Sequence, residues 1–476
     1  MEDERFDVVV IGCGPAGQHA ATRSARAGKL VALVDEREVV GGQCLHVGTI
    51  PSKTLRTAIL HAAGYYERAI FGEDHRGQGA THGELMERLR SVVGREVDVI
   101  HEQLEHAGVC VVHGRGRLMG PRRIEVRRND GGFRFLVADK IVIAVGSRSV
   151  ALEKIPFDGY HILNTDQILR LPFLPRSLVV VGGGVVGLEY ACMFSLLDIE
   201  VHLVTRYAEL LPFADRDIMR ELLAHMERNG VRLHPERTVV STRVAQGKQV
   251  TTELSDGTVL DSQMLFYAGQ RFGATQGLGL ELAGLQPNER GLISVDDCYR
   301  TVVPHIYAVG DVIGFPSLAA TAIDQGRKAA NHLVGLDDVP IHPLFPFGLY
   351  TIPDISMVGP TEQQLQRDGV EYAVGVGRYR DSAKGQILGD ATGLVKLIFE
   401  PENRKLLAVH IFGVDATELI HIGQAVMRLG GDIDYFVDTV FNYPTLAEVY
   451  KLAAVDGLHK LGVMEPGAPL KGLPGK

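Results

Sequence analysis

The fold is decided by a stretch near the N-terminus, Phe6-Asp7-Val8-Val9-Val10-Ile11-Gly12-Cys13-Gly14-Pro15-Ala16-Gly17. Its apolar first half predicts a buried strand, and its glycine-rich second half predicts a tight turn into a helix that ends near Ala27. A second strand is expected over Leu30–Val34, directly before Asp35 and Glu36. Strand, glycine turn, helix, strand and terminal acid make up a βαβ unit of the kind that binds a dinucleotide.

The glycines of this turn let the backbone approach a pyrophosphate closely, and the N-terminus of the helix attracts the phosphate charge. The acid after the second strand is placed to accept hydrogen bonds from a ribose. The residues expected at this first site are Gly12, Gly14, Pro15, Ala16, Gly17, Asp35 and Glu36.

The whole pattern repeats in the middle of the chain. Leu178–Val181 predicts a strand, Gly182-Gly183-Gly184-Val185-Val186-Gly187 a turn, Leu188–Leu197 a helix and Glu200–Val204 a second strand. Two complete fingerprints imply two dinucleotides. The residues expected at the second site are Gly182, Gly184, Val185, Val186, Gly187, Thr205 and Arg206.

The residues after the second strand of the repeat bear on which nucleotide binds there. An NAD-selective site carries an acid that takes the ribose 2′-hydroxyl and would repel a 2′-phosphate. This chain has Thr205 and Arg206, with no acid before Glu209. The Arg206 guanidinium can pair with a 2′-phosphate, yet no second arginine stands in that turn. We predict a site that tolerates both NAD(H) and NADP(H); the alternative is that Arg206 simply points into solvent.

Composition narrows the class of protein. The chain has 476 residues, of which 45% are apolar and 22% are charged, and its length suggests about three domains. The net charge of −9 argues against nucleic acid as a partner. The basic stretch Arg115–Arg128 alternates with apolar residues, so we interpret it as the solvent-facing side of strands. No apolar run is long enough for a membrane helix, and the start Met1–Arg5 is acidic, so we expect a cytoplasmic protein without a membrane partner.

The cysteines and histidines give no metal pattern. The five cysteines, at positions 13, 44, 110, 192 and 298, show no paired spacing, and His101, His106 and His113 lack ligand spacing. We predict no metal. We interpret His421 as a structural histidine on a helix. Four thiols are expected to be small core residues: Cys13, Cys110, Cys192 and Cys298.

Two further segments lie far apart in the chain. They are Gly41-Gly42-Gln43-Cys44-Leu45-His46-Val47-Gly48-Thr49-Ile50-Pro51-Ser52-Lys53 and Tyr443-Pro444-Thr445-Leu446-Ala447-Glu448. Both resemble the flavoprotein disulfide reductases, the pyridine nucleotide-disulfide oxidoreductase family. In that family a second cysteine lies five positions after the first, and the C-terminal motif begins with histidine. Thr49 and Tyr443 stand at those positions here, so both parts needed to reduce a disulfide are missing.

The resemblance spans nearly the whole chain and implies an α/β fold. It implies two Rossmann-like dinucleotide-binding domains, for FAD and NAD(P), plus a C-terminal α+β dimerisation domain that builds a homodimer or a higher homo-oligomer. The implied parts are the FAD-binding domain over 1–150, the NAD(P)-binding domain over 151–270, a return to the FAD or central domain over 271–343, the interface domain over 344–463 and a flexible tail over 464–476. Within the interface domain, Leu394–Phe399 and Lys405–Phe412 predict an antiparallel hairpin, and helices are expected over Ala416–Leu429 and Thr445–Leu461.

The resemblance also implies roles around the flavin. It places the ADP half of FAD on the first fingerprint and the ribityl chain on Asp311. Lys53 would lie by flavin N5 with Glu189 as its ion-pair partner, where a cation helps the ring to accept hydride; the alternative is a plain interdomain salt bridge. Further cofactor contacts are implied for Gly42, Cys44, Gly146, Ser147, Gly269 and Gly310.

Cys44 and Tyr443 join Lys53 and Glu189 as candidate catalytic residues. A tyrosine, with a pKa of about 10, is a poor general base near neutral pH. We therefore interpret Cys44 as a packed thiol beside the flavin, and the alternative is a single redox-active thiol. Tyr443 would pack against the isoalloxazine edge from the second subunit.

The missing disulfide relay decides the expected activity. Three segments are similar to the branch of the family that moves hydride between pyridine nucleotides: Gly48–Arg56, Tyr350–Ser356 and Phe441–Thr445. This similarity implies that NADPH gives hydride to flavin N5, NADP+ leaves, and NAD+ enters the same site to collect it, in a reversible ping-pong reaction. The alternatives are an NAD(P)H oxidase or quinone reductase, a flavin-bearing redox sensor that uses Cys44, and a dihydrolipoamide dehydrogenase.

Overall fold

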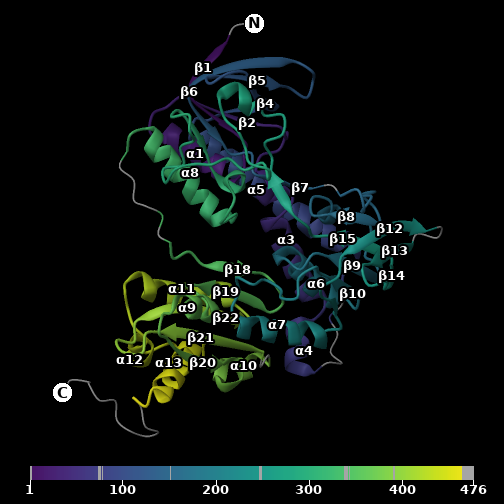
Figure 1. Ribbon diagram of the computed structural model, residues 1–476, viewed down its shortest axis with the longest axis vertical. Coiled ribbons are helices and arrows are strands. Elements are labelled where there is room, and N and C mark those ends of the chain that lie inside the picture. Colours follow the sequence, from purple (N-terminus) through teal and green to yellow (C-terminus); the bar gives the residue numbers. More distant parts are fainter. Residues whose placement is uncertain are drawn as a thin grey trace.

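Three large sheets with their covering helices organise the chain in the computed structural model (Figure 1). The structure describes residues 3–463, apart from 73–76, 78, 151, 246–248, 337–340, 342, 390 and 391. The expected tail over 464–476 lies outside the described residues. No helix in the described part of the chain combines the length and the apolar character that crossing a membrane needs.

The first sheet forms around the first fingerprint, in the order β3-β2-β1-β6-β5-β4, and β17 also pairs with β6. β1 pairs in parallel with both β2 and β6, and α1 (Pro15–Arg26) connects β1 to β2. β17 comes after the second sheet in sequence, so the chain returns to the first sheet late. The strands are β1 (Glu4–Ile11), β2 (Val31–Asp35), β3 (Cys110–His113), β4 (Arg115–Leu118), β5 (Arg123–Arg127), β6 (Phe133–Ile143) and β17 (Ile306–Ala308).

Two helices, α5 (His82–His106) and α8 (Ala319–Leu333), pack with α1 beside the first sheet. Three others follow β2: α2 (Gly42–His46), α3 (Thr49–Ala62), which also contacts α6 (Val185–Ser195), and α4 (Tyr65–Phe71), which contacts α3. Exposed and buried residues alternate along β4 and β5, and this confirms that the basic stretch is the solvent-facing side of strands.

The second sheet forms around the repeat, in the order β11-β10-β9-β15-β8. All of its pairings are parallel, and α6 (Val185–Ser195) connects β9 to β10 as expected for a βαβ unit. The strands are β8 (Ile162–Asn164), β9 (Ser177–Val181), β10 (Glu200–Val204), β11 (Arg232–His234) and β15 (Met264–Tyr267). A small antiparallel sheet of β12 (Val239–Ala245), β13 (Gln249–Leu254) and β14 (Val259–Ser262) extends from it.

The third sheet is antiparallel, in the order β18-β19-β22-β21-β20. The expected hairpin is confirmed, because β21 (Gly393–Phe399) pairs with β22 (Leu406–Gly413). The two expected helices are also confirmed, as α11 (Ala416–Arg428) and α13 (Glu448–Lys460). The remaining strands are β18 (Phe347–Leu349), β19 (Asp354–Val358) and β20 (Ala373–Arg378).

A buried lysine joins the second and third sheets. Lys396 lies on β21 with 1% of its side chain exposed, and its Nζ is 2.8 Å from Asp215 Oδ1 and 2.8 Å from Asp217 Oδ2. Both acids belong to the start of α7 (Arg216–Arg228), where Asp215 is the N-cap. Glu362, at the start of α9 (Glu362–Asp368), pairs with the same ammonium. Burial alone would lower the pKa of Lys396, but these carboxylates raise it above its usual value.

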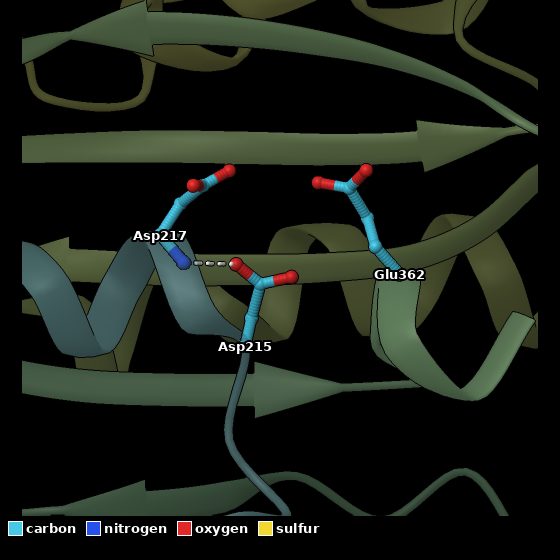
Figure 2. Close-up of side chains that lie close together, drawn as sticks. All are labelled: Asp215, Asp217 and Glu362. Atoms are coloured by element: carbon cyan, nitrogen blue, oxygen red, sulfur yellow. Dashed lines mark hydrogen bonds between the residues drawn. The ribbon is translucent and has the colours of Figure 1, made fainter. Parts of the chain in front are cut away.

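Figure 2 shows the three acids converging, with the backbone N–H of Asp217 donating to Asp215. Asp215, Asp217 and Glu362 are close enough together to suggest a metal site, and they are the one such group within the described residues. The Lys396 ammonium occupies the space between them, so the positive charge that they need is already supplied by the protein.

Replacement of Lys396 by methionine should destabilise the protein strongly. Asp215 is 1% exposed, so it would keep a buried negative charge without a positively charged partner, and such a loss costs about 3–5 kcal/mol. Asp217 is 44% exposed, so Asp217→Asn should cost less than about 1 kcal/mol. Urea unfolding of both variants measures the difference, and equal losses would mean that the buried pair contributes no more than a surface pair.

Candidate functional site

One cavity of about 760 Å³ collects residues from the first sheet, from the third sheet and from α6, the helix beside the second sheet. The first fingerprint forms one part of its wall, and Val185, Val186 and Glu189 from the start of α6 form another. A third part comes from the loop after β18, which carries Tyr350. The predicted residues that line it are Gly12, Gly14, Pro15, Ala16, Asp35, Glu36, Gly42, Cys44, Lys53, Gly146, Val185, Val186, Glu189, Gly310 and Asp311.

Other predicted residues lie outside the wall of this cavity. Ser147 is directly behind it, because its hydroxyl donates to Asp311 Oδ2 at 2.8 Å. The second fingerprint lies at the carboxyl edge of the second sheet, with only the start of α6 reaching the cavity. The residues outside the wall are Gly17, Ser147, Gly182, Gly184, Gly187, Thr205, Arg206, Gly269 and Tyr443.

The two glycine turns have the same internal geometry. A Cβ atom on Gly17 would lie 1.9 Å from Gly12 O, and one on Gly187 would lie 1.8 Å from Gly182 O. These glycines are therefore needed for the close packing of helix on turn. A Cβ on Gly14, in contrast, would meet nothing within 4 Å, so Gly14 faces open space where a pyrophosphate could approach.

The carboxylate of Asp35, at the end of β2, is fixed in position by two backbone hydrogen bonds. It is 7% exposed and accepts hydrogen bonds from Cys13 N–H at 2.6 Å and Arg37 N–H at 2.9 Å. Burial raises the pKa of its carboxyl, and the two backbone donors partly offset this. The carboxylate lines the cavity, which is the position that a ribose hydroxyl needs.

Lys53, Glu189 and Tyr350 bring the three parts of the molecule together. Lys53 Nζ lies 2.6 Å from Glu189 Oε2, and the other carboxylate oxygen accepts the backbone N–H of Tyr350 at 2.9 Å. The Tyr350 ring also faces the ammonium, with 4.7 Å between Nζ and the ring centre. Glu189 is 5% exposed, so its charge depends on these two contacts. A cation is thereby fixed in the cavity wall.

Cys44 has no sulfur partner. All five cysteines are free thiols, and Cys44 lies in the cavity wall together with Thr49. Burial raises the pKa of the Cys44 thiol, and hydrogen bonds from Thr49 and Ile50 offset only part of the effect. The thiolate that disulfide exchange requires is therefore disfavoured at neutral pH.

The prediction for the other cysteines is right for two and wrong for two. Cys13 and Cys192 are buried, and burial raises the pKa of each thiol to about 12. Cys110 is exposed because it lies on β3, an edge strand of the first sheet. Cys298 is partly exposed because it lies in a turn.

Several cavity residues were not predicted as site residues. Arg271 donates to Ser147 Oγ at 3.1 Å and to Asp166 Oδ1 at 3.0 Å, so it supports the hydroxyl that holds Asp311. His421 was expected to be structural, but it lies in the cavity wall, with its ring Nδ1 2.9 Å from Gln424 Oε1. Helical periodicity alone could not show that this face of α11 meets a cavity.

The cavity fits a flavin dinucleotide. It runs from Asp35 and the open side of Gly14 to the Lys53–Glu189 pair, so it offers a ribose acceptor, a phosphate turn and a fixed cation. Gln43 Oε1 also lines it and is buried with no hydrogen-bond partner within the described residues. A ligand that donates a hydrogen bond would satisfy this atom.

Tyr443 lies outside the cavity of its own chain. Its side chain is 71% exposed, in the segment between α12 (Asp434–Asp438) and α13. Glu448 begins α13, and its Oε2 is buried without a hydrogen-bond partner in the part of the chain that the structure describes. A single chain therefore does not bring Tyr443 to Lys53.

Two family models together match most of the chain. The model described as pyridine nucleotide-disulphide oxidoreductase matches residues 6–326, and the model of that family's dimerisation domain matches residues 345–454.

Known proteins are similar over nearly the full length. A soluble pyridine nucleotide transhydrogenase of Mycobacterium bovis is 45% identical, over 96% of this chain and 98% of the relative. One of Hahella chejuensis is 40% identical, over 97% and 100%. Among solved structures, LpdA from Mycobacterium tuberculosis has a TM-score of 0.87 at 27% identity, over 95% of this chain and 99% of that one. The HOCl-induced flavoprotein disulfide reductase RclA from Escherichia coli has a TM-score of 0.86 at 25% identity, over 94% and 99%.

Alanine at Gly14 and at Gly184 should separate the two nucleotide sites. Both positions have ordinary negative φ and open space at Cβ, so each variant should fold. Gly14→Ala should lower the flavin content of the purified protein, because its methyl group enters the first site. Gly184→Ala should keep the flavin but weaken nicotinamide nucleotide binding by about tenfold, or about 1.4 kcal/mol.

Flavin absorbance and nucleotide titration measure the two effects, and thermal unfolding controls for the fold. Loss of flavin in Gly184→Ala with none in Gly14→Ala would reverse the assignment of the two sites.

Proposed function

The chain belongs to the pyridine nucleotide-disulphide oxidoreductase family, and we propose that it is an FAD-dependent transhydrogenase that moves hydride between NADPH and NAD+ in either direction. The curated relatives that cover nearly the whole chain bear the name soluble pyridine nucleotide transhydrogenase. The proposed reaction is ping-pong, because one site serves both nucleotides in turn.

The observation that carries this proposal is that Cys44 lies in the cavity wall without a second cysteine as its disulfide partner. Thr49 stands beside it, all five cysteines are free, and burial raises the pKa of the thiol. A route through a disulfide therefore has neither its second sulfur nor a ready thiolate. The start of α6 opens the second nucleotide site onto the same cavity, so a nicotinamide can both deliver and collect there.

The protein's own residues bind and orient the reactants. When bound, FAD supplies the group that takes hydride from one nicotinamide and gives it to the next. The ammonium of Lys53, held by Glu189, places positive charge in the wall and favours negative charge in the bound ring. Tyr350 closes the wall on that side, and burial raises the pKa of its phenol, which keeps it neutral.

The remaining site residues have supporting roles in this proposal. Gly12, Gly14 and Asp35 would hold the adenosine diphosphate part of FAD, and Asp311, which accepts a hydrogen bond from Ser147, would hold the ribityl chain. Gly146, Gly269 and Gly310 let the backbone lie close to the bound nucleotides.

We also propose a homodimer and a cytoplasmic location. The match of residues 345–454 to a dimerisation domain supports the homodimer, in which the exposed Tyr443 would cover the flavin edge of the second subunit. Five free thiols suit a reducing compartment. We keep the proposed domain boundaries at 150, 270 and 343; the pairing of β17 with β6 supports the proposed return of the chain to the first domain.

Anaerobic turnover tests the proposal directly. Purified protein mixed with NADPH and thio-NAD+ should form thio-NADH promptly, and the initial rates should give the parallel lines of a ping-pong reaction. Parallel assays supply oxygen, a quinone or lipoamide as the acceptor. Fast turnover with one of those acceptors and none with thio-NAD+ would replace the proposal with an oxidase, a quinone reductase or a disulfide reductase.

Cys44→Ser should retain most of the transhydrogenase activity, because the thiol has no partner for electron relay. A loss above about tenfold, or roughly 1.4 kcal/mol in the barrier, would show that the thiol takes part in the reaction. Cys192→Ser serves as the control, since Cys192 is also a free thiol but is buried on α6, outside the cavity wall.

A further inference from the structure

Two loops meet at the carboxyl edge of the second sheet, next to the second fingerprint. Thr205 follows β10, and its N–H donates to His234 O on β11 at 3.0 Å. The N–H of Arg237 donates back to Thr205 O at 2.9 Å. The turn that carries Arg206 is therefore joined by backbone hydrogen bonds to the loop that carries Arg237.

This edge is where the second nucleotide would place its adenosine ribose. A Cβ on Gly183, inside the fingerprint, would lie 2.8 Å from Thr205 Oγ1, so the glycine turn packs directly on Thr205. Ligands of parallel sheets bind at the carboxyl ends of the strands, and the ribose contacts the end of the second strand of the βαβ unit. Arg237 thus supplies the second arginine that the sequence of the Arg206 turn lacks.

Each arginine has a replaceable partner in the free protein. The Arg206 guanidinium lies 4.7 Å from the centre of the Tyr207 ring and donates to its hydroxyl. Arg237 Nε donates to Asp256 Oδ2 at 2.5 Å, in the turn between β13 and β14. The hydrogen bond from Arg237 is the main reason that the pKa of Asp256 falls to about 2. Both Arg237 and Asp256 remain partly exposed, at 38% and 33%, so a ligand can reach them.

Three other titratable groups lie near this edge. Glu209 pairs with Arg216 at 2.8 Å, and Glu236 accepts a hydrogen bond from Arg237 only through its backbone oxygen, at 3.1 Å. Burial lowers the pKa of His234, which keeps that ring neutral. Arg206 and Arg237 have partly exposed partners, so a phosphate could recruit both cations without breaking a buried pair.

We propose that Arg237 is a second residue that reads the nucleotide 2′-phosphate, and that it is shared between that phosphate and Asp256. The inference rests on the proposed function, because it assumes that NADP(H) binds at this edge. With NAD(H), Arg237 stays on Asp256 and no charge is left unpaired. With NADP(H), a phosphate of charge about −2 competes for both guanidinium groups. The exchange would let one site accept both nucleotides.

The test compares two fragments that differ in the 2′-phosphate, 2′,5′-ADP and 5′-AMP, by calorimetric titration of the holoenzyme. Arg237→Gln should lower the affinity for 2′,5′-ADP by about tenfold and change the affinity for 5′-AMP by less than about twofold. Arg206→Ala is the reference variant. It should weaken the binding of 2′,5′-ADP by at least the same factor, and it should weaken the binding of NADPH more than that of NADH.

Arg232→Gln is the matched control for Arg237→Gln. Arg232 begins β11, the strand that precedes the loop of Arg237, and it pairs with Glu200 at 2.5 Å, but it lies at the amino end of that strand. It should leave the ratio of the two affinities unchanged. An equal loss in Arg232→Gln, or an unchanged ratio in Arg237→Gln, would overturn the assignment.

Asp256→Asn tests the sharing. In the wild-type background it should raise the affinity for 2′,5′-ADP by about threefold, because Asp256 no longer competes for Arg237. In the Arg237→Gln background it should have no effect, because the pair between Arg237 and Asp256 is already absent. Equal tightening in both backgrounds would show that Asp256 acts only through its long-range charge. The titrations require no turnover, so they give an answer whether or not the protein transfers hydride to thio-NAD+.

Discussion

The ion pair between Lys53 and Glu189 is the contact on which the site depends. Lys53 follows the Cys44 segment, Glu189 lies on α6, and the backbone of Tyr350 completes the carboxylate's hydrogen bonds from the interface domain. A nearly buried carboxylate is stable only when its oxygens have such partners. One interaction therefore links three domains and also places a positive charge in the cavity wall.

A second interdomain contact keeps that arrangement. Lys396 joins the start of α7 to the third sheet through Asp215, which is as fully buried as the lysine itself. It is the cation that its acidic neighbours require, so three converging carboxylates need no metal ion to be stable (Figure 2). The two lysines have different surroundings: Lys396 has 1% of its side chain exposed, whereas Lys53 has 26% exposed and faces the cavity. The first holds domains together, and the second can act on a bound ring.

The proposed function follows from two features: Thr49 stands where the family has a second cysteine, and one cavity serves both nucleotide sites. Thr49 in place of a second thiol removes the sulfur route, and burial keeps Cys44 protonated. The same cavity receives the start of α6, which connects it to the second nucleotide site. An enzyme of this kind must accept two nucleotides that differ by one phosphate. Arginines with replaceable partners, as at Arg206 and Arg237, meet that need with less discrimination than a fixed acid or a dedicated phosphate pocket.

The sequence alone determined both βαβ units, the hairpin of the interface domain and the loss of the disulfide relay, because glycine turns, strand periodicity and motif residues are local features. It also named the residues of the cavity wall that belong to these motifs, among them Gly14, Asp35 and Lys53. Only the tertiary structure decided that His421 and Tyr350 face the cavity, that Lys396 lies among three acids, and that Arg237 adjoins Thr205. Those neighbours are far apart in the chain, and their contacts depend on how sheets, loops and domains pack, which no local pattern encodes.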